Sequence, residues 1–100
     1  MIRHIVLWTL KEHAEGSSRE ENLKKVKSEL ESLKNKIPVI QSMHVGINFD
    51  TSSDAFDIIL NADFNNKEDL KIYQEHPEHL KVVQFLRKVR DKRVVADYEI

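Results

Sequence analysis

The stretch "YQEHPEHL", Tyr73 to Leu80, decides how the second half of this chain folds. Pro77 lies inside a sequence of helical period, but it lacks the N–H that would continue a helix begun before it. Proline does suit the first turn of a new helix. We therefore expect a short helix over "NNKEDLKIYQEH" (65–76), capped by Asn65 or Asn66. A second helix should begin at Pro77 over "PEHLKVVQFLRKVRDK", with its apolar period set by Leu80, Val83, Leu86 and Val89 or Arg90.

Strand patterns flank this broken helix. Before it, "AFDIILNADF" (55–64) alternates between a face with Phe56, Ile58, Leu60, Ala62 and Phe64 and a face with Asp57, Ile59, Asn61 and Asp63. "VIQSMHVGINF" (39–49) is a moderate strand, and the polar link "DTSSD" (50–54) predicts an antiparallel hairpin between the two. "RVVADYEI" (93–100) predicts a closing strand.

The first third of the chain predicts a strand, a loop and a helix. "IRHIVLWTL" (2–10) is apolar on both faces, and "KEHAEGSS" (11–18) is expected to be a loop. Ser17 and Ser18 stand three residues before glutamates, the spacing of a capping box. A helix should follow to about Lys36, before Pro38, with its apolar stripe made by Leu23, Val26, Leu30, Leu33 and Ile37.

The predicted order is β-α-β-β-α-β in a single domain, residues 1–100, with the second helix broken at Pro77. This order predicts an α+β, ferredoxin-like fold, in which a four-stranded antiparallel sheet carries its helices on one face. Ile5, Leu7 and Ile59 would then lie on the uncovered face. We expect a homodimer that packs sheet against sheet and closes an α+β barrel, which hides this apolar surface.

The composition of the chain argues against several classes of function. The 100 residues are 40% hydrophobic and 33% charged, with a formal net charge of -1, so a nucleic-acid partner is not expected. No apolar run reaches the ~20 residues needed to cross a bilayer. The chain has no cysteine, which fits a cytoplasmic location and excludes a cysteine nucleophile.

Several stretches resemble the stress-responsive A/B barrel (Dabb) family of dimeric α+β barrels. They are "HIVLW" in the first strand, "IP" after the first helix, "ADF" before "EDL", "YQEHPEH" at the helix break and "ADY" near the end. The resemblance covers nearly the whole chain, and the Tyr-x-x-His-Pro-x-His run is its most specific part. The family has no single chemistry; its plant stress proteins are not chiefly known as enzymes.

One plant member of that family, olivetolic acid cyclase, condenses a linear polyketide, and its catalytic tyrosine and histidine match Tyr73 and His79. The resemblance also implies that His4 and His76 belong to the pocket. Ile58 stands where the cyclase has a further pocket histidine, so the substrate is expected to differ. Trp8 is a further candidate for stacking on a ligand, although a strand tryptophan is more often part of the core.

The residue types at the break suit acid–base chemistry. Proton abstraction beside a carbonyl needs a base such as His79 and a donor such as the Tyr73 hydroxyl. Structural roles compete: His76 could cap a helix, His79 could donate to a buried carbonyl, and Tyr73 could fill the core with its hydroxyl bound to backbone. His76 and His79 could also hold a metal ion, but Pro77 disturbs the helical spacing and we expect none.

Two more polar features remain open at this stage. Asp97 could pair with Arg3 or lie at the dimer seam. "RKVRDKR" (87–93) is expected to be a solvated helix end rather than a phosphate site.

We therefore expect a homodimer that binds a small, mostly apolar carbonyl compound between sheet and helices. If it is an enzyme, it should use no cofactor and act as a cyclase-like lyase or an isomerase. One alternative is a non-catalytic stress or interaction module whose dimer is the functional unit. Another is a cofactor-free oxygenase, an activity of other dimeric α+β barrels.

Overall fold

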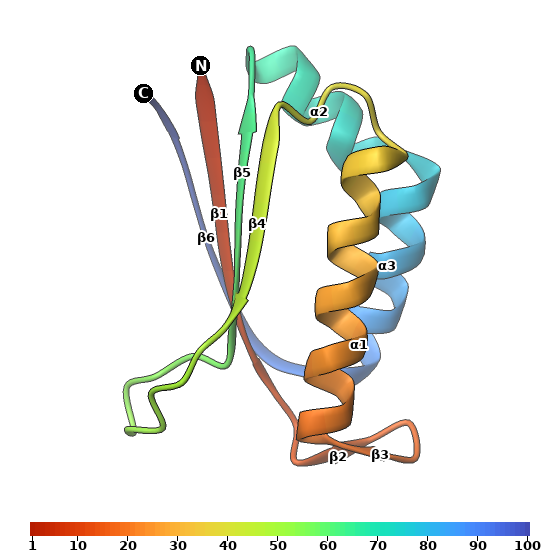
Figure 1. Ribbon diagram of the computed structural model, residues 1–100, viewed down its shortest axis with the longest axis vertical. Coiled ribbons are helices and arrows are strands. Elements are labelled where there is room, and N and C mark those ends of the chain that lie inside the picture. The colour runs from red at the N-terminus through yellow and green to blue at the C-terminus, as the bar shows by residue number, and fades with distance from the viewer.

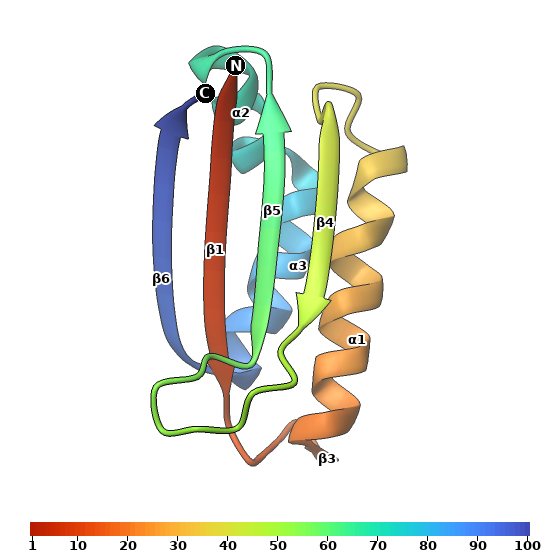
Figure 2. The same ribbon diagram turned by 60° about the vertical axis from the view of Figure 1, so that its left-hand side comes forward.

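The computed structural model describes residues 1–100 and is built around one four-stranded antiparallel sheet in the order β4-β5-β1-β6 (Figure 2). Its strands are β1 (Ile2–Leu10), β4 (Ser42–Ile47), β5 (Ile58–Phe64) and β6 (Arg90–Glu99). Helices α1 (Arg19–Ser32), α2 (Lys67–Glu75) and α3 (Pro77–Val89) lie against one face of the sheet and leave the other open (Figure 1). The expected α+β, ferredoxin-like arrangement is confirmed.

The core lies between the sheet and the helices. Alternate residues of β1 are buried, beginning with Ile2 and ending with Leu10, and their neighbours are half-buried. On β5 the predicted face is correct from Ile58 to Phe64. Strand alternation in the sequence therefore identified which side of the sheet meets the helices.

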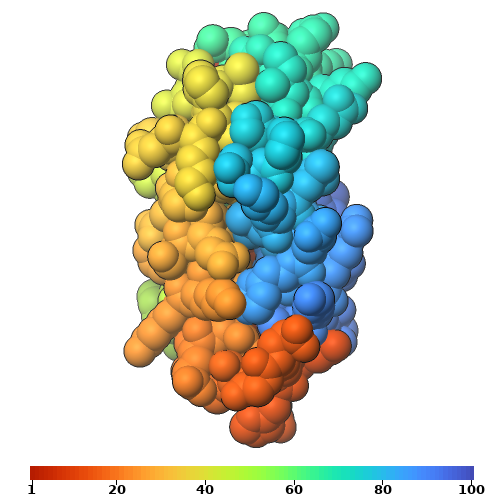
Figure 3. Space-filling model, turned by 90° about the vertical axis from the view of Figure 1, so that its right-hand side faces the viewer, coloured from red at the N-terminus to blue at the C-terminus, as the bar shows by residue number.

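Helix α1 begins and packs as predicted. The Ser18 hydroxyl accepts a hydrogen bond from the Glu21 backbone N–H, and the Glu21 carboxylate accepts one from the Ser18 backbone N–H, which completes a capping box. The helix passes into a single 3₁₀ turn, η1 (Leu33–Asn35). All five residues of the expected stripe are buried: Leu23, Val26, Leu30, Leu33 and Ile37. Figure 3 shows α1 lying beside α3 on the helical side of the molecule.

The break between α2 and α3 falls at the expected place. Asn66 caps α2, since its side-chain oxygen accepts the Asp69 backbone N–H. His76 ends α2 and also caps α3: its Nδ1 accepts a hydrogen bond from the Glu78 backbone N–H at 3.1 Å. Pro77 then takes the first helical position, where the missing N–H costs nothing.

The buried face of α3 agrees with the expected one in part. Leu86 and Val89 are buried as predicted, but Val82 is buried where Val83 was expected, and Leu80 is 46% exposed. Apolar residues occupy two adjacent helical stripes here, so the 3.6-residue period allows either stripe to face the sheet. The direction of α3 after the break at Pro77 determines which of the two stripes faces the sheet.

Two connections also differ from their predicted form. The segment expected to be a loop contains a small hairpin of β2 (His13–Ala14) and β3 (Ser17–Ser18), whose turn residues Glu15 and Gly16 both have positive φ. The link between β4 and β5 is longer than five residues, because Ile47 ends one strand and Ile58 begins the next. Figure 1 shows this longer link extending from the open side of the sheet.

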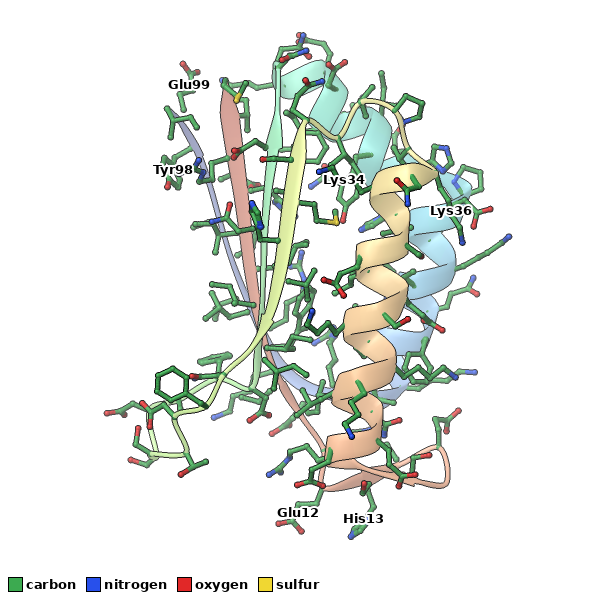
Figure 4. All side chains as sticks on the ribbon, viewed as in Figure 1. Glu12, His13, Lys34, Lys36, Tyr98 and Glu99 are labelled. Carbon is green, nitrogen blue, oxygen red and sulfur yellow. The ribbon has the colours of Figure 1, made fainter.

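The open face of the sheet carries both an ion pair and apolar side chains. Arg3 donates two hydrogen bonds to the Asp63 carboxylate, at 2.9 and 3.1 Å, and the Ser42 hydroxyl donates a third at 3.0 Å. Arg3 thereby holds the pKa of Asp63 below its usual value. Tyr98 lies on the side of β6 that faces away from the helices, whereas Glu12 and His13 lie at the far hairpin (Figure 4).

Candidate functional site

A cavity of about 370 Å³ lies between the sheet and the helices. Its size is within the range of small-molecule sites in proteins. Strand β1 supplies His4, Val6 and Trp8, and the helix break supplies Tyr73 and His79. The remaining lining residues are Leu30, Leu60, Gln74, Leu80, Val82, Val83, Leu86, Arg87, Arg90 and Arg93. Most of the wall is therefore apolar, with a few polar groups on it.

Tyr73 is completely buried in this wall, yet no protein group hydrogen-bonds its hydroxyl. Its ring packs on Phe64, with ring centroids 5.1 Å apart, and burial raises the pKa of the phenol. The hydroxyl therefore stays protonated at neutral pH and can donate a hydrogen bond. The structural alternative, in which this hydroxyl is bound to backbone, does not occur in the structure.

His79 lies against Tyr73, with their ring centroids 4.3 Å apart. Its Nδ1 is 3.1 Å from the Gln74 carbonyl oxygen, which can only accept, so Nδ1 carries the proton in this contact. In the neutral ring, Nε2 is then left as an acceptor. Burial is the main reason that the pKa of His79 is lowered, with smaller contributions from His4, Arg93 and His76. His79 therefore has the neutral form that a general base needs.

His4 also lies near Tyr73, with its ring centroid 6.2 Å from that of the tyrosine. It is buried, and its Nδ1 is hydrogen-bonded to the carboxylate of Asp97, its direct cross-strand neighbour. The expectation that Asp97 could pair with Arg3 is wrong, because Arg3 pairs with Asp63 on the open face. Asp97 instead orients His4. The sequence did indicate that Asp97 and Tyr98 lie on opposite faces of the strand, because successive strand residues alternate between faces.

The structure brings together four of the six site residues expected from sequence: Tyr73, His79, His4 and Trp8. His76 and Ile58 do not line the cavity. His76 is occupied as a helix cap, and Ile58 is buried in β5 opposite Trp8. The run "RKVRDKR" is largely exposed, as expected for a solvated helix end, but sequence reasoning missed that its three arginines, Arg87, Arg90 and Arg93, also line the cavity. No group of three or more His, Asp or Glu side chains is placed to hold a metal ion.

Fold and cavity together define a ferredoxin-like α+β domain with a mostly apolar pocket between its sheet and helices. A tyrosine and a histidine are among the polar groups of the pocket wall. The family model of the stress responsive A/B barrel domain (Dabb) matches residues 2–100. This chain therefore belongs to the Dabb family, as its motifs predicted. None of the curated proteins compared matches it.

Solved structures show the same fold. A dimeric protein of ferredoxin-like fold from Bacteroides fragilis is 32% identical, with a TM-score of 0.83 over 99% of this chain and 95% of that one. A hydroxynitrile lyase from Passiflora edulis is 20% identical, with a TM-score of 0.82 over 99% and 92%. An antibiotic biosynthesis monooxygenase is 13% identical, with a TM-score of 0.72 over 100% and 98%.

The last two proteins carry different activities on one fold, so the fold alone does not assign a reaction to this chain. The function has to be argued from the cavity. None of the helices combines the length and apolar character needed to cross a membrane.

Proposed function

We propose that this protein binds a small, mostly apolar carbonyl compound in the cavity, and that Tyr73 and His79 act on its carbonyl group without a cofactor. The observation that carries the proposal is the Tyr73 hydroxyl, which is buried in the cavity wall without any hydrogen-bond partner. A buried polar group without a partner costs about 1–3 kcal/mol. A bound carbonyl oxygen would accept from this hydroxyl and remove that cost.

The two side chains would divide the chemistry between them. Tyr73 would donate a hydrogen bond to the carbonyl oxygen, where negative charge develops as an enolate forms. Nε2 of neutral His79 would take the proton from the carbon beside that carbonyl. Returning that proton to another position gives an isomerisation. Attack of the enolate carbon on a second carbonyl of the same molecule gives an aldol cyclisation.

A homodimer is part of the proposal. The open face of the sheet exposes apolar side chains from neighbouring strands, among them Ile59, Val94 and Tyr98, each more than a third exposed. The Bacteroides fragilis relative is dimeric, which supports the same assembly here. A cytoplasmic location also belongs to the proposal, and its support is the lack of cysteine in the sequence.

Tyr73→Phe tests the carbonyl site, because it removes one hydroxyl and almost no volume. Nonan-2-one is a suitable probe, and its binding can be followed by calorimetry. We expect about tenfold weaker binding by the variant, equivalent to one lost hydrogen bond of about 1.4 kcal/mol. The free energy of unfolding should stay the same or rise by about 1 kcal/mol, because an unsatisfied group is removed.

Tyr98→Phe is the matched control, since Tyr98 lies on the open face of the sheet and should leave binding unchanged. Unchanged binding together with a loss of stability in Tyr73→Phe would show that the tyrosine is structural. That result would favour the alternative of a non-catalytic module whose dimer is its function.

A further inference from the structure

The cavity has two chemically different ends. His4, Tyr73 and His79 lie at one end, where β1 begins and the helices break. Arg87, Arg90 and Arg93 line the other end, from the last turn of α3 to the first residues of β6. His4 and Trp8 are four residues apart on β1, so about 13 Å of strand separates the backbone at the two ends. The long side chain of Arg93, which pairs with Trp8, is the arginine whose charge acts on Tyr73 and His79.

The three arginines have no anionic partner in the protein. None of the seven ion pairs in the structure includes Arg87, Arg90 or Arg93. Asp97 lies on the same side of β6 as Arg93, but its carboxylate is hydrogen-bonded to His4. Three guanidinium groups on one cavity wall without a carboxylate repel one another, and an anion between them would relieve that repulsion.

Strand register explains why at least one of these cations faces the cavity. Arg93 pairs with Trp8, just as Val95 pairs with Val6 and Asp97 with His4. Paired residues in an antiparallel sheet project to the same side, so Arg93 lies on the helical side of β6. Its charge is close enough to affect both Tyr73 and His79. Arg87 and Arg90 come from the end of α3 and from the residue that follows it.

From this juxtaposition we propose that the natural ligand is an oxo acid: an apolar chain with its carbonyl at the Tyr73–His79 end and a carboxylate held by Arg87, Arg90 and Arg93. The inference rests on the proposed carbonyl site and adds the class of compound that it accepts. Guanidinium forks match a carboxylate with two parallel hydrogen bonds. The apolar wall between the two ends, formed by residues such as Val6, Val82 and Leu86, would hold the chain.

The test compares 8-oxononanoate with its methyl ester, which keeps the ketone and the chain but removes the charge. Calorimetry on the wild-type protein should show that the acid binds about tenfold more tightly than the ester. This ratio corresponds to about 1.4 kcal/mol from charge-assisted hydrogen bonds that are partly exposed to solvent. In Arg87→Gln/Arg90→Gln/Arg93→Gln the affinity for the acid should fall to that for the ester. Arg93→Gln alone should lose part of the preference, and it provides the test if the triple variant does not fold.

The matched control is Lys24→Gln/Lys34→Gln/Lys71→Gln, which removes the same net charge from lysines that do not line the cavity and have no ion pair. It should keep the preference for the acid. Equal binding of acid and ester by the wild type would overturn the oxo-acid proposal and leave the carbonyl site standing. A preference that survives the arginine variants, or disappears in the lysine control, would also overturn it.

Two further outcomes separate the remaining possibilities. If neither acid nor ester binds, the proposed carbonyl site itself fails, and the oxo-acid inference falls with it. If inorganic phosphate displaces the acid more strongly than an equal concentration of acetate, the arginines select phosphate and the carboxylate assignment is wrong.

Discussion

At the scale of single residues, Tyr73 and His79 show how burial prepares two neighbouring groups in opposite ways. Burial disfavours the charged form of each side chain, so the phenol keeps its proton and the imidazole loses its own more readily. One residue is thus kept as a donor and the other as an acceptor over the same pH range. Their rings lie against each other, with centroids 4.3 Å apart, so the donor and the acceptor are neighbours in the cavity wall.

The lowered pKa of His79 predicts a pH dependence of stability. The folded protein binds a proton at His79 less readily than the unfolded chain, whose histidine titrates near 6.5. Stability from this group is therefore complete above about pH 6.5 and falls as the pH drops through the lowered value. Urea unfolding between about pH 5 and pH 8 should show this loss in the wild type.

His79→Gln provides the comparison, because glutamine can still donate to the Gln74 carbonyl but does not titrate. At acidic pH the unfolding free energy of the wild type should fall relative to that of the variant. At neutral and higher pH the difference between the two proteins should stay constant. Parallel curves for the two proteins across the whole range would contradict the lowered pKa.

At the scale of elements, the helix break depends on one side chain that serves two helices. His76 ends α2, and its Nδ1 accepts the Glu78 backbone N–H at the start of α3. The break in turn places Tyr73 and His79, six residues apart, on one cavity. A continuous helix would place these two side chains about 120° apart around its axis and about 9 Å apart along it.

Replacing the cap should therefore destabilise the fold by a measurable amount. His76→Ala leaves the Glu78 N–H without its partner and should cost about 1 kcal/mol of unfolding free energy. His76→Asn restores a good capping side chain and should recover most of that loss. Urea denaturation at neutral pH measures both variants. An asparagine variant as unstable as the alanine variant would show that His76 contributes through packing rather than through the cap.

Element identity could be predicted from sequence where a local rule has only one solution. The alternation of β1 and β5, the capping box at Ser18 and the break at Pro77 are such cases. The buried face of α3 was predictable only in part, since two apolar stripes compete and tertiary packing chooses. The long link after β4 was also missed. The Asn48 side chain accepts a hydrogen bond from the Asp50 backbone N–H, and the Asp50 side chain accepts one from that of Ser52. The chain therefore turns before the predicted strand ends.

The candidate site was predictable in part for a related reason. Tyr73 and His79 belong to one short motif, and His4 shares a strand face with Trp8. The partner of Asp97 and the cavity arginines depend on the register between β1 and β6, which joins residues about 90 positions apart. No local pattern in the sequence encodes that register.

At the scale of the whole molecule, the sheet is covered on one face only. In the proposed homodimer, the open face meets the same face of a second copy. Ile59 lies on central strand β5 and is 37% exposed. A charge placed there would be buried without a partner in the dimer, at a cost of several kcal/mol.

Ile59→Lys should therefore raise the dimer dissociation constant by at least about tenfold, since a tenfold change needs only about 1.4 kcal/mol. Sedimentation at micromolar concentration should show a dimer for the wild type and a shift toward monomer for the variant. Ile72→Lys is the control, because Ile72 is 50% exposed on α2 and lies away from the sheet. A wild type that sediments as a stable monomer would refute the dimer.

Strand β6 has a further consequence for the behaviour of the protein in solution. It forms an edge of the sheet over ten residues, and such an edge can recruit strands from other molecules into aggregates. Val94, Val95 and Tyr98 would favour that recruitment. Charged side chains stand on both sides of them, from Arg90 to Arg93 and again at Asp97 and Glu99. The residues that line the cavity and orient His4 therefore also act as gatekeepers against amyloid-like stacking.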